Sequence, residues 1–513
     1  MKVFFRLLVP FLALSHTPGW AQELSLHPLI KHGAVLQREV PLSLKGQAKP
    51  GAEVSVEWQD EVFKGKADSN GKWSVLLPTG PTKEQGQNLR VRSGAESLQI
   101  TNLLVGEVWL ASGQSNMEWI LKSCAVQSAE AARAEDPLLR FVTIPRSIAD
   151  QPAETVPVAW QSATPESVLK LSAVAYFFAR ELRRELKVPV GIISSAYGGT
   201  PAESWTPEAT LAADALLSPA LEKRKSYPSE YPKLLAEYEK KKPDYDATVA
   251  AAQAAGTKPP PKLNPPQPVG NNPYLASVLW NSMIFPLLPY PIRGVIWYQG
   301  EANAKRAEKY ETLLSSMITA WRKSWNRGDF PFLIVQLADF NNDPEGPTGT
   351  SWARLRDAQT AVADKVPQCG VAVTLGLGDA EDIHPQRKME VGERLAKLAR
   401  KIAYGQDVPC SGPVLQMAQS TGKEMELTFQ SVHGSLQTSD GRKPGSFSLS
   451  GKDCKFYPAT ARIEGRRVVL SSPEVSEPAF VRYAWSNRPE NPNLTDDSKL
   501  PARPFRTDPD PKP

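Results

Sequence analysis

Short apolar segments alternate with amphipathic segments through the middle of this chain. The apolar segments have the length of buried strands, and the amphipathic ones repeat with the period of a helix. The predicted strands are residues 108–112, 190–196, 294–298, 332–337 and 371–377. The predicted helices are at about 172–187, 306–326, 352–364 and 386–404. Strand–helix alternation of this kind predicts a mostly parallel sheet with helices on both faces.

The pattern at both ends of the chain is that of β-structure. Residues 22–103 contain short polar–apolar alternations, as at 54–58, broken by turn signals such as Asn70-Gly71. From about residue 411 this pattern returns, with strands predicted at 425–429 and 467–470, and the Pro-rich tail after Leu500 is expected to be irregular. The sequence therefore predicts an N-terminal β-sandwich domain at 22–103, an α/β domain at 104–410 and a C-terminal β domain with its tail at 411–513.

An inserted segment interrupts the α/β pattern at about 206–272. Its middle is charged and helical, including 234–242, and it then becomes Pro-rich between 259 and 268. A Pro-rich stretch is stiff and extended, so we expect it to be exposed. A lid, a partner-binding arm and a solvated decoration would all fit this pattern.

The N-terminus has the features of an export signal. Lys2 and Arg6 precede an apolar stretch at 7–14, and small residues lead to an expected cleavage site after Ala21. The alternative is a buried N-terminal strand or helix. No later segment has the roughly 20 apolar residues that a membrane span needs. A signal peptide at 1–21 predicts a secreted or periplasmic protein.

Charge and cysteine content exclude several classes of function. A net charge of +5 over 513 residues gives no reason to expect binding to nucleic acid or to an anionic membrane surface. The four cysteines show no Cys-x-x-Cys spacing, so they do not indicate a metal site. In an oxidising compartment they allow three disulfide connectivities, and buried free thiols are the alternative.

Polar clusters follow four of the five predicted strands. In parallel α/β sheets ligands bind at the carboxyl ends of the strands, so these clusters are expected to meet at one edge. They are Gly113-Gln114-Ser115-Asn116-Met117, Tyr197-Gly198-Gly199-Thr200, Gln299-Gly300-Glu301-Ala302-Asn303 and Asp382-Ile383-His384-Pro385.

Ser115 is the candidate nucleophile, and a serine needs a base because its hydroxyl is barely ionised at neutral pH. Of the five histidines only His384 lies in the predicted α/β domain, which makes it the candidate base. A carboxylate should orient the imidazole, and Asp382 is the nearest in sequence. Glu381 and Glu301 are rivals for that role.

A developing oxyanion needs hydrogen-bond donors. The backbone N–H groups of Ser115 and Gly199 are candidates, since glycine lets the main chain approach closely. A side-chain amide after the third strand, from Gln299 or Asn303, could supply a third donor.

Taken in order, these motifs resemble those of the sialate O-acetylesterase-like carbohydrate esterases of the SGNH hydrolase superfamily, and the resemblance covers nearly all of the mature chain. Further matching segments lie outside the four clusters. They are Val35-Leu36-Gln37-Arg38, Gly106-Glu107-Val108-Trp109, Glu203-Ser204-Trp205, Trp297-Tyr298, Val481-Arg482-Tyr483-Ala484-Trp485 and Leu500-Pro501-Ala502-Arg503-Pro504-Phe505-Arg506.

The resemblance implies a flavodoxin-like, three-layer, doubly wound parallel sheet flanked by β-sandwich-like regions. It places the nucleophile at Ser115, the base at His384 and the oxyanion glycine at Gly199. The superfamily usually spaces its acid and base as Asp-x-x-His, whereas here one residue separates Asp382 from the histidine. A Gln-Gly-Glu-x-Asn run replaces the asparagine of the superfamily's third sequence block. In some related esterases the glutamate of this run, here Glu301, is a candidate triad acid.

The sequence thus predicts a serine esterase that removes O-acetyl groups from carbohydrates without a metal or cofactor. The expected partner is an acetylated carbohydrate. Sialic acid esters, acetylated xylan and other acetylated polysaccharides remain open as substrates, and the oligomeric state is not determined. A non-catalytic carbohydrate-binding protein on the same scaffold is the alternative, because the 13 tryptophans would also suit sugar stacking.

Overall fold

The computed structural model describes residues 24–341, 346 and 349–509. The predicted signal peptide at 1–21 lies outside the described residues and stays a prediction. The chain divides into two compact units. Among the described residues, one holds 24–27 with Ser43–Leu77 and Leu89–Gln99, and the other holds Pro28–Leu42, Pro78–Asn88 and the described chain from Ile100.

The smaller unit is built from antiparallel strands. One sheet has the order β1 (Ser25–Leu26), β3 (Leu42–Gln47), β6 (Lys72–Leu77). Beside it β4 (Glu53–Trp58) pairs with β5 (Glu61–Lys66) and β7 (Lys83–Ser93). Val54, Val56 and Trp58 are buried in β4 while the residues between them are more exposed, which confirms the predicted alternation.

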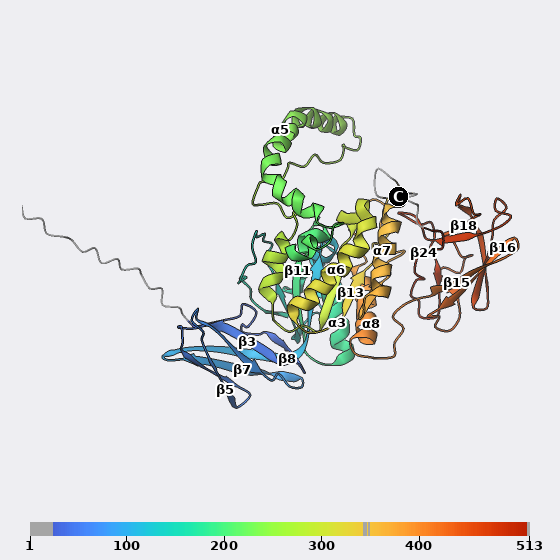
Figure 1. Ribbon diagram of the computed structural model, residues 1–513. Helices are drawn as coiled ribbons and strands as arrows, with labels where there is room; N and C mark the ends of the chain where they lie inside the picture. The colour runs from blue at the N-terminus through green and yellow to red at the C-terminus, as the bar shows by residue number, and fades with distance from the viewer. Residues whose placement is uncertain (1–23, 342–345, 347–348, 510–513) are drawn as a thin grey trace, which may run out of the picture. The chain divides into compact units, whose positions relative to one another are not determined.

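A mainly parallel sheet forms the centre of the larger unit (Figure 1). Its parallel strands follow the order β9-β11-β8-β12-β13-β14, with β10 antiparallel at the β9 edge. β2 (Val35–Gln37) adds parallel pairing to β8. The strands are β8 (Glu96–Gly113), β9 (Asp136–Thr143), β10 (Gln161–Ala163), β11 (Val190–Ala196), β12 (Gly294–Tyr298), β13 (Phe332–Val335) and β14 (Cys369–Ala372). A mixed α/β fold with this central sheet and additional antiparallel sheets confirms the predicted class.

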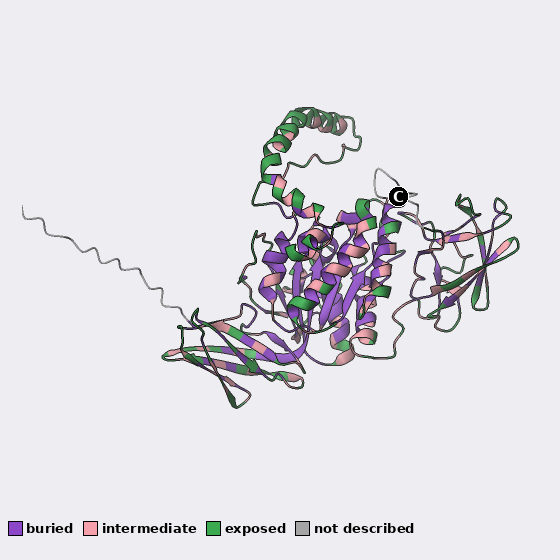
Figure 2. Cartoon of the chain, in the orientation of Figure 1, coloured by how far each residue is buried: buried purple, intermediate pink, exposed green. Residues whose placement is uncertain are grey.

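Four helices pack on this sheet close to their predicted positions. They are α3 (Ala173–Leu186), α6 (Ala307–Trp325), α7 (Ser351–Lys365) and α8 (Lys388–Ile402). α3 packs against α8, and α6 packs against α7. Ser172 Oγ caps α3 by accepting from Ala175 N at 3.2 Å, and Lys187 ends it in the left-handed conformation at φ 54°. The central strands between these helices are buried throughout (Figure 2).

Strand β9 was not predicted, because Pro137 and Arg140 interrupt its apolar residues. Arg140 is nevertheless buried. Its guanidinium donates to Gly33 O at 2.9 Å and to Asn102 Oδ1 at 2.9 Å. Because these acceptors offset the cost of burying the charge, the strand can pair with β11 inside the sheet.

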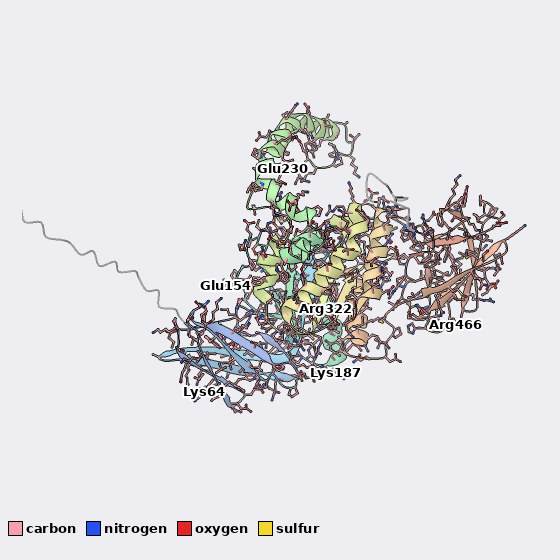
Figure 3. All side chains as sticks on the ribbon, in the orientation of Figure 1. Lys64, Glu154, Lys187, Glu230, Arg322 and Arg466 are labelled. Atoms are coloured by element: carbon pink, nitrogen blue, oxygen red, sulfur yellow. The ribbon has the colours of Figure 1, made fainter. Side chains whose placement is uncertain are left out.

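The insertion contains a short helix, α4 (Glu208–Ala212), and a long one, α5 (Pro219–Ala254), which is far longer than the helical core expected at 234–242. Pro228, Pro232 and Pro243 lie inside it. Most of α5 is exposed (Figure 2), and Glu230 lies on this exposed part (Figure 3). At its base Tyr227 is buried and donates its hydroxyl to Gln267 O at 2.5 Å, which joins the helix to the returning Pro-rich segment.

The C-terminal region forms small antiparallel sheets around an apolar cluster. The strands predicted at 425–429 and 467–470 are confirmed as β16 and β21, and the tail after Leu500 is irregular apart from β24. The strands are β15 (Val414–Thr421), β16 (Glu424–Gln430), β17 (Gln437–Thr438), β18 (Phe447–Ser450), β19 (Tyr457–Pro458), β20 (Thr460–Glu464), β21 (Arg467–Ser471), β22 (Phe480–Tyr483), β23 (Leu494–Thr495) and β24 (Phe505–Arg506). Val373 and Leu375, which follow β14, belong to the same cluster.

Two further observations bear on the sequence predictions. Cys124, Cys369, Cys410 and Cys454 are all free thiols, so none of the three disulfide connectivities is formed. Within the described residues, no helix has both the length and the apolar character needed to cross a membrane.

One buried carboxylate, Glu107, joins two of the segments that match the esterase family, 35–38 and 106–109. Glu107 in β8 is fully buried and accepts from Arg38 Nε at 2.5 Å, Arg293 Nε at 2.7 Å and Gln37 Nε2 at 3.1 Å. Gln37 Oε1 in turn accepts from Val108 N at 2.8 Å. Burial alone would raise the pKa of Glu107, but the hydrogen bonds and charges of Arg293 and Arg38 outweigh it and the pKa is lowered.

Replacing Glu107 with Ala should therefore destabilise the fold by about 2–4 kcal/mol, because it leaves two half-buried arginines, Arg38 and Arg293, without their buried counter-charge. Urea unfolding at pH 7 measures this change. Since the folded pKa is depressed, the stabilisation by Glu107 is present above the ordinary glutamate value of roughly 4.3 and is lost as pH falls from there through the folded value. The difference between wild type and variant should accordingly shrink in acid, and a difference that stays constant down to pH 2 would contradict this account.

Candidate active site

Ser115 lies directly beyond the carboxyl end of β8, as the first residue of the short helix α1 (Ser115–Glu118). β8 ends at Gly113 with φ 138°, and a Cβ there would lie 2.1 Å from Tyr298 O. Only glycine permits this close approach to β12. Gln114 then turns inward, and its Oε1 accepts from Gly300 N at 3.3 Å and Ala302 N at 3.2 Å. The turn that presents the serine is thus fixed to the loop after β12.

The glycine turn after β11 lies against Ser115. A Cβ at Gly198 would lie 3.4 Å from Ser115 Cβ, and Gly198 N donates to Glu118 Oε2 at 2.9 Å. Gly199 has φ 75°, a conformation that favours glycine. Within the described residues the N–H groups of Ser115 and Gly199 donate to no backbone carbonyl. Donors of this kind can bind a negatively charged oxygen atom.

The structure brings the nucleophile turn and the histidine loop together. Asn116 Nδ2 donates to Ile383 O at 3.0 Å across 267 positions of sequence. Trp119, just after α1, stacks on the His384 ring with centroids 4.7 Å apart and an interplanar angle of 16°. The imidazole is thereby held beside the end of the sheet where Ser115 lies.

Asp382 is the carboxylate beside the imidazole. Its Oδ1 accepts from His384 N at 2.8 Å and lies 3.5 Å from His384 Nδ1. Glu381 points away, to Lys258 at 3.7 Å and Asn341 Nδ2 at 3.3 Å. From this position Asp382 can favour the tautomer of His384 that carries its proton on Nδ1.

Glu301 lies behind the nucleophile turn rather than beside the histidine. Its Oε1 accepts from Asn116 Nδ2 at 2.5 Å, while its buried Oε2 has no hydrogen-bond partner among the described residues. Burial raises the pKa of Glu301, and the bond from Asn116 and the charge of Lys388 offset part of this increase.

The environment of His384 favours the neutral ring. Burial lowers its pKa and the charge of Lys388 lowers it further, whereas Asp382 acts in the opposite direction, and the net pKa is lowered. A neutral imidazole is the form that can accept a proton, so the histidine is in its basic form near neutral pH.

Gln299 and Asn303 form a buried network between the loops after β11 and β12. Gln299 Nε2 donates to Asn303 Oδ1 at 2.7 Å and to Thr200 O at 3.3 Å, so both of its amide hydrogens are engaged. Asn303 Nδ2 donates to Glu203 Oε2 at 2.9 Å. The predicted role of Gln299 as a third oxyanion donor stays a prediction, and in this arrangement it would require the amide to leave one of these acceptors.

Three side chains near the site escaped the sequence reasoning: Trp119, Glu118 and Lys388. Trp119 covers the imidazole, and Glu118 ties Gly198 to Arg146. Lys388 is fully buried and donates to Asn116 Oδ1. A lysine in the first turn of the helix predicted at about 386–404 was the one local signal available, because a cation there opposes the helix dipole.

A cavity of about 380 Å³ opens beside Gly199. Tyr274 lies over the glycine, with its ring 3.5 Å from a Cβ placed there. The inserted segment supplies part of the wall through Leu216, Leu217 and Lys223. Arg306, Lys309 and Glu203 line the cavity as well, and Arg306 pairs with Glu203 at 3.1 Å. This ion pair leaves Lys223 and Lys309 without a carboxylate among the lining residues, so the cavity has a net positive charge.

The chain is similar to known carbohydrate esterases. Residues 276–401 match the family model described as carbohydrate esterase, sialic acid-specific acetylesterase. The chain is 28% identical to the sialate O-acetylesterase of Homo sapiens over 93% of this chain and 91% of the human protein. It is 28% identical to that of Rattus norvegicus over 92% of each chain. A carbohydrate acetylesterase from Xanthomonas citri has a similar structure, with a TM-score of 0.80, 35% identity and coverage of 94% of this chain and 99% of that one.

Proposed function

Since this chain belongs to the sialate O-acetylesterase family of carbohydrate esterases and removes O-acetyl groups from sugars, we propose that Ser115 is its nucleophile and His384 its general base. The contact that carries this proposal is the bond from Asn116 to Ile383 O, because it joins the turn of one residue to the loop of the other. The stacking of Trp119 on the imidazole supports the same pairing.

The reaction divides into two acyl-transfer steps. Ser115 Oγ attacks the acetyl carbonyl as its proton passes to His384, and the imidazolium then protonates the sugar oxygen that leaves. Water, deprotonated by the same imidazole, releases acetate and restores the serine. The N–H groups of Ser115 and Gly199 stabilise the oxyanion in both steps. Asp382 holds the ring and stabilises the imidazolium.

The strand order supports the finer fold assignment. The strands that carry the site follow the spatial order β11-β8-β12-β13-β14, which numbered along the chain is the flavodoxin-like order 2-1-3-4-5. Right-handed crossovers would then place the α3–α8 pair and the α6–α7 pair on opposite faces of the sheet. We propose that β9 and β10 extend this sheet beyond its usual edge. The domain boundaries at 103 and 410 remain part of this proposal.

The cationic cavity favours an acidic sugar as substrate. Glu203, the one carboxylate that lines the cavity, is already paired with Arg306, so Lys223 and Lys309 can offer a counter-charge to a sugar carboxylate. This supports acetylated sialic acids over neutral acetylated xylan. Acetate release from a panel of both substrate types tests the choice, and faster release from acetylxylan would reverse it.

Tyr274 is positioned to stack on a sugar ring at the mouth of the cavity. It is 46% exposed, which leaves an aromatic surface open beside the oxyanion glycine. Tyr274→Ala should raise KM for an acetylated oligosaccharide roughly tenfold, since aromatic contacts of this kind contribute about 0.5–1.5 kcal/mol beyond their buried area. Hydrolysis of p-nitrophenyl acetate, which carries no sugar, should change little. Tyr457→Ala, at another exposed tyrosine, is the matched control.

An active-site fluorophosphonate distinguishes the enzyme from a binding protein on the same scaffold. The probe should label Ser115, and peptide mass spectrometry locates the adduct. Absence of labelling in folded protein that still binds acetylated sugar would favour the non-catalytic alternative. The N-terminal export pattern leads us to propose a secreted or periplasmic location, which fractionation of cells expressing the full chain would test.

A further inference from the structure

Lys388 is a buried cation in a place where folding alone gives it no advantage. It is the first residue of α8 and is completely buried. A positive charge in the first helical turn opposes the helix dipole, and fully buried lysines are rare unless they are paired. Among the described residues Lys388 forms no ion pair, and the acidic groups that act on its charge are Glu301, Asp382 and the Cys124 thiol. Departures from local rules of this kind are expected at functional sites.

The ammonium group settles the orientation of Asn116. Lys388 Nζ donates to Asn116 Oδ1 and lies 5.5 Å from the centre of the Tyr298 ring. A lysine can only donate, so the amide oxygen must face it and the amide nitrogen must face the other way. That nitrogen donates to Glu301 Oε1 at 2.5 Å and to Ile383 O at 3.0 Å. The residue next to the nucleophile is thus bonded to both the loop after β12 and the loop of the histidine.

The same charge acts on the catalytic imidazole. Burial lowers the pKa of Lys388 to about 8, against the attraction of Glu301, so the side chain is mostly protonated at pH 7. The charged groups that act on His384 are Asp382 on its own loop and Lys388 on α8. Trp119, from the nucleophile turn, adds an aromatic face without charge. Of the two charged groups, Asp382 favours protonation of the His384 ring and Lys388 opposes it.

We propose that Lys388 is a positioning residue of the esterase reaction: through Asn116 it holds the turn of Ser115 against the loop of His384, and its ammonium charge acts together with burial to disfavour protonation of the imidazole. This inference rests on the proposed roles of Ser115 and His384. The lysine itself neither touches the substrate nor transfers a proton.

Two variants separate the two parts of this role. Lys388→Met removes both the charge and the donor to Asn116, whereas Lys388→Gln removes the charge and keeps an N–H donor. In both variants the acidic limb of the pH profile of kcat/KM, measured with p-nitrophenyl acetate, should move upward by roughly 0.5–1 pH unit. The reason is that the Lys388 charge no longer repels the protonated form of His384, so its pKa rises. Lys388→Met should in addition lower kcat roughly 10–100-fold with little change in KM, and Lys388→Gln should retain more of it. If the Met variant does not fold, the Gln variant alone still tests the shift of the acidic limb.

The control is Lys401→Met, the same change at the exposed end of the same helix, which should leave the profile unmoved. Titration of the His384 ring by NMR reports the same shift without turnover. An acidic limb that stays in place in a folded Lys388 variant overturns the proposal, whatever happens to kcat. Failure of the proposed function is a separate result, because it would appear as activity that persists in a Ser115 variant.

Discussion

Ser115→Ala should lower kcat by about 10⁵–10⁶, to the level that oxyanion donors and substrate binding can sustain without a nucleophile. Ser115 follows β8 directly, its Cβ lies 3.4 Å from a Cβ placed at Gly198, and the next residue, Asn116, bonds to the histidine loop. Removing one oxygen creates little strain, so the fold should be unaffected. Initial rates with p-nitrophenyl acetate and with an acetylated sugar measure the change.

Ser123→Ala is the matched control, since Ser123 is exposed and lies in the 3-10 turn that follows α1. Its activity should equal that of the wild type. Unfolding of the Ser115 variant by urea should also match the wild type, which separates lost chemistry from lost structure. Near-full turnover by folded Ser115→Ala would show that the nucleophile lies elsewhere.

His384→Ala should cost nearly as much, about 10⁴–10⁶ in kcat, because the serine then has no base. The ring makes its stacking contact with Trp119 and its polar contact with Asp382, so the variant loses both. The acidic limb of the pH profile, which reports the imidazole, should disappear with it. In the wild type this limb should lie below pH 6.5, since the pKa of His384 is lowered.

His433→Ala offers the comparison, because His433 lies in the C-terminal region and its backbone N–H, not its ring, bonds to Asp496. That variant should keep both its turnover and its acidic limb. Added imidazole should restore part of the activity of His384→Ala by entering the space left by the ring. A His384 variant that retained the wild-type pH profile would remove this residue from the mechanism.

The sequence predicted the central strands well where the apolar run coincides with the strand. β11 and β12 begin and end at the predicted residues, because both are continuous buried runs bounded by polar clusters. β14 is shorter than the predicted 371–377, since Val373 and Leu375 are apolar for another reason: they pack in the C-terminal cluster.

Other features depend on contacts that no local pattern contains. β8 is one strand from Glu96 to Gly113, and its change from alternating to continuous burial reflects a change in surroundings rather than a new element. The predicted domain boundary at 103 falls inside it. Ser115 and His384 could be proposed as candidates from strand ends and from the short list of histidines, and the structure brings their loops together. Trp119 and Lys388 could not, because their partners lie more than 260 positions away in sequence.

The hydrogen bond from Tyr227 to Gln267 O joins the first part of α5 to the end of the segment that returns from it. Leu216, Leu217 and Lys223, which line the cavity, all precede Tyr227 in the chain. Apart from Lys258, which lies 3.7 Å from Glu381 on the histidine loop, the stretch from 228 to 266 is therefore an appendage, and we expect its length and composition to vary without displacing the cavity wall. It is the natural place to graft a tag, a surface anchor or a second binding module onto this enzyme.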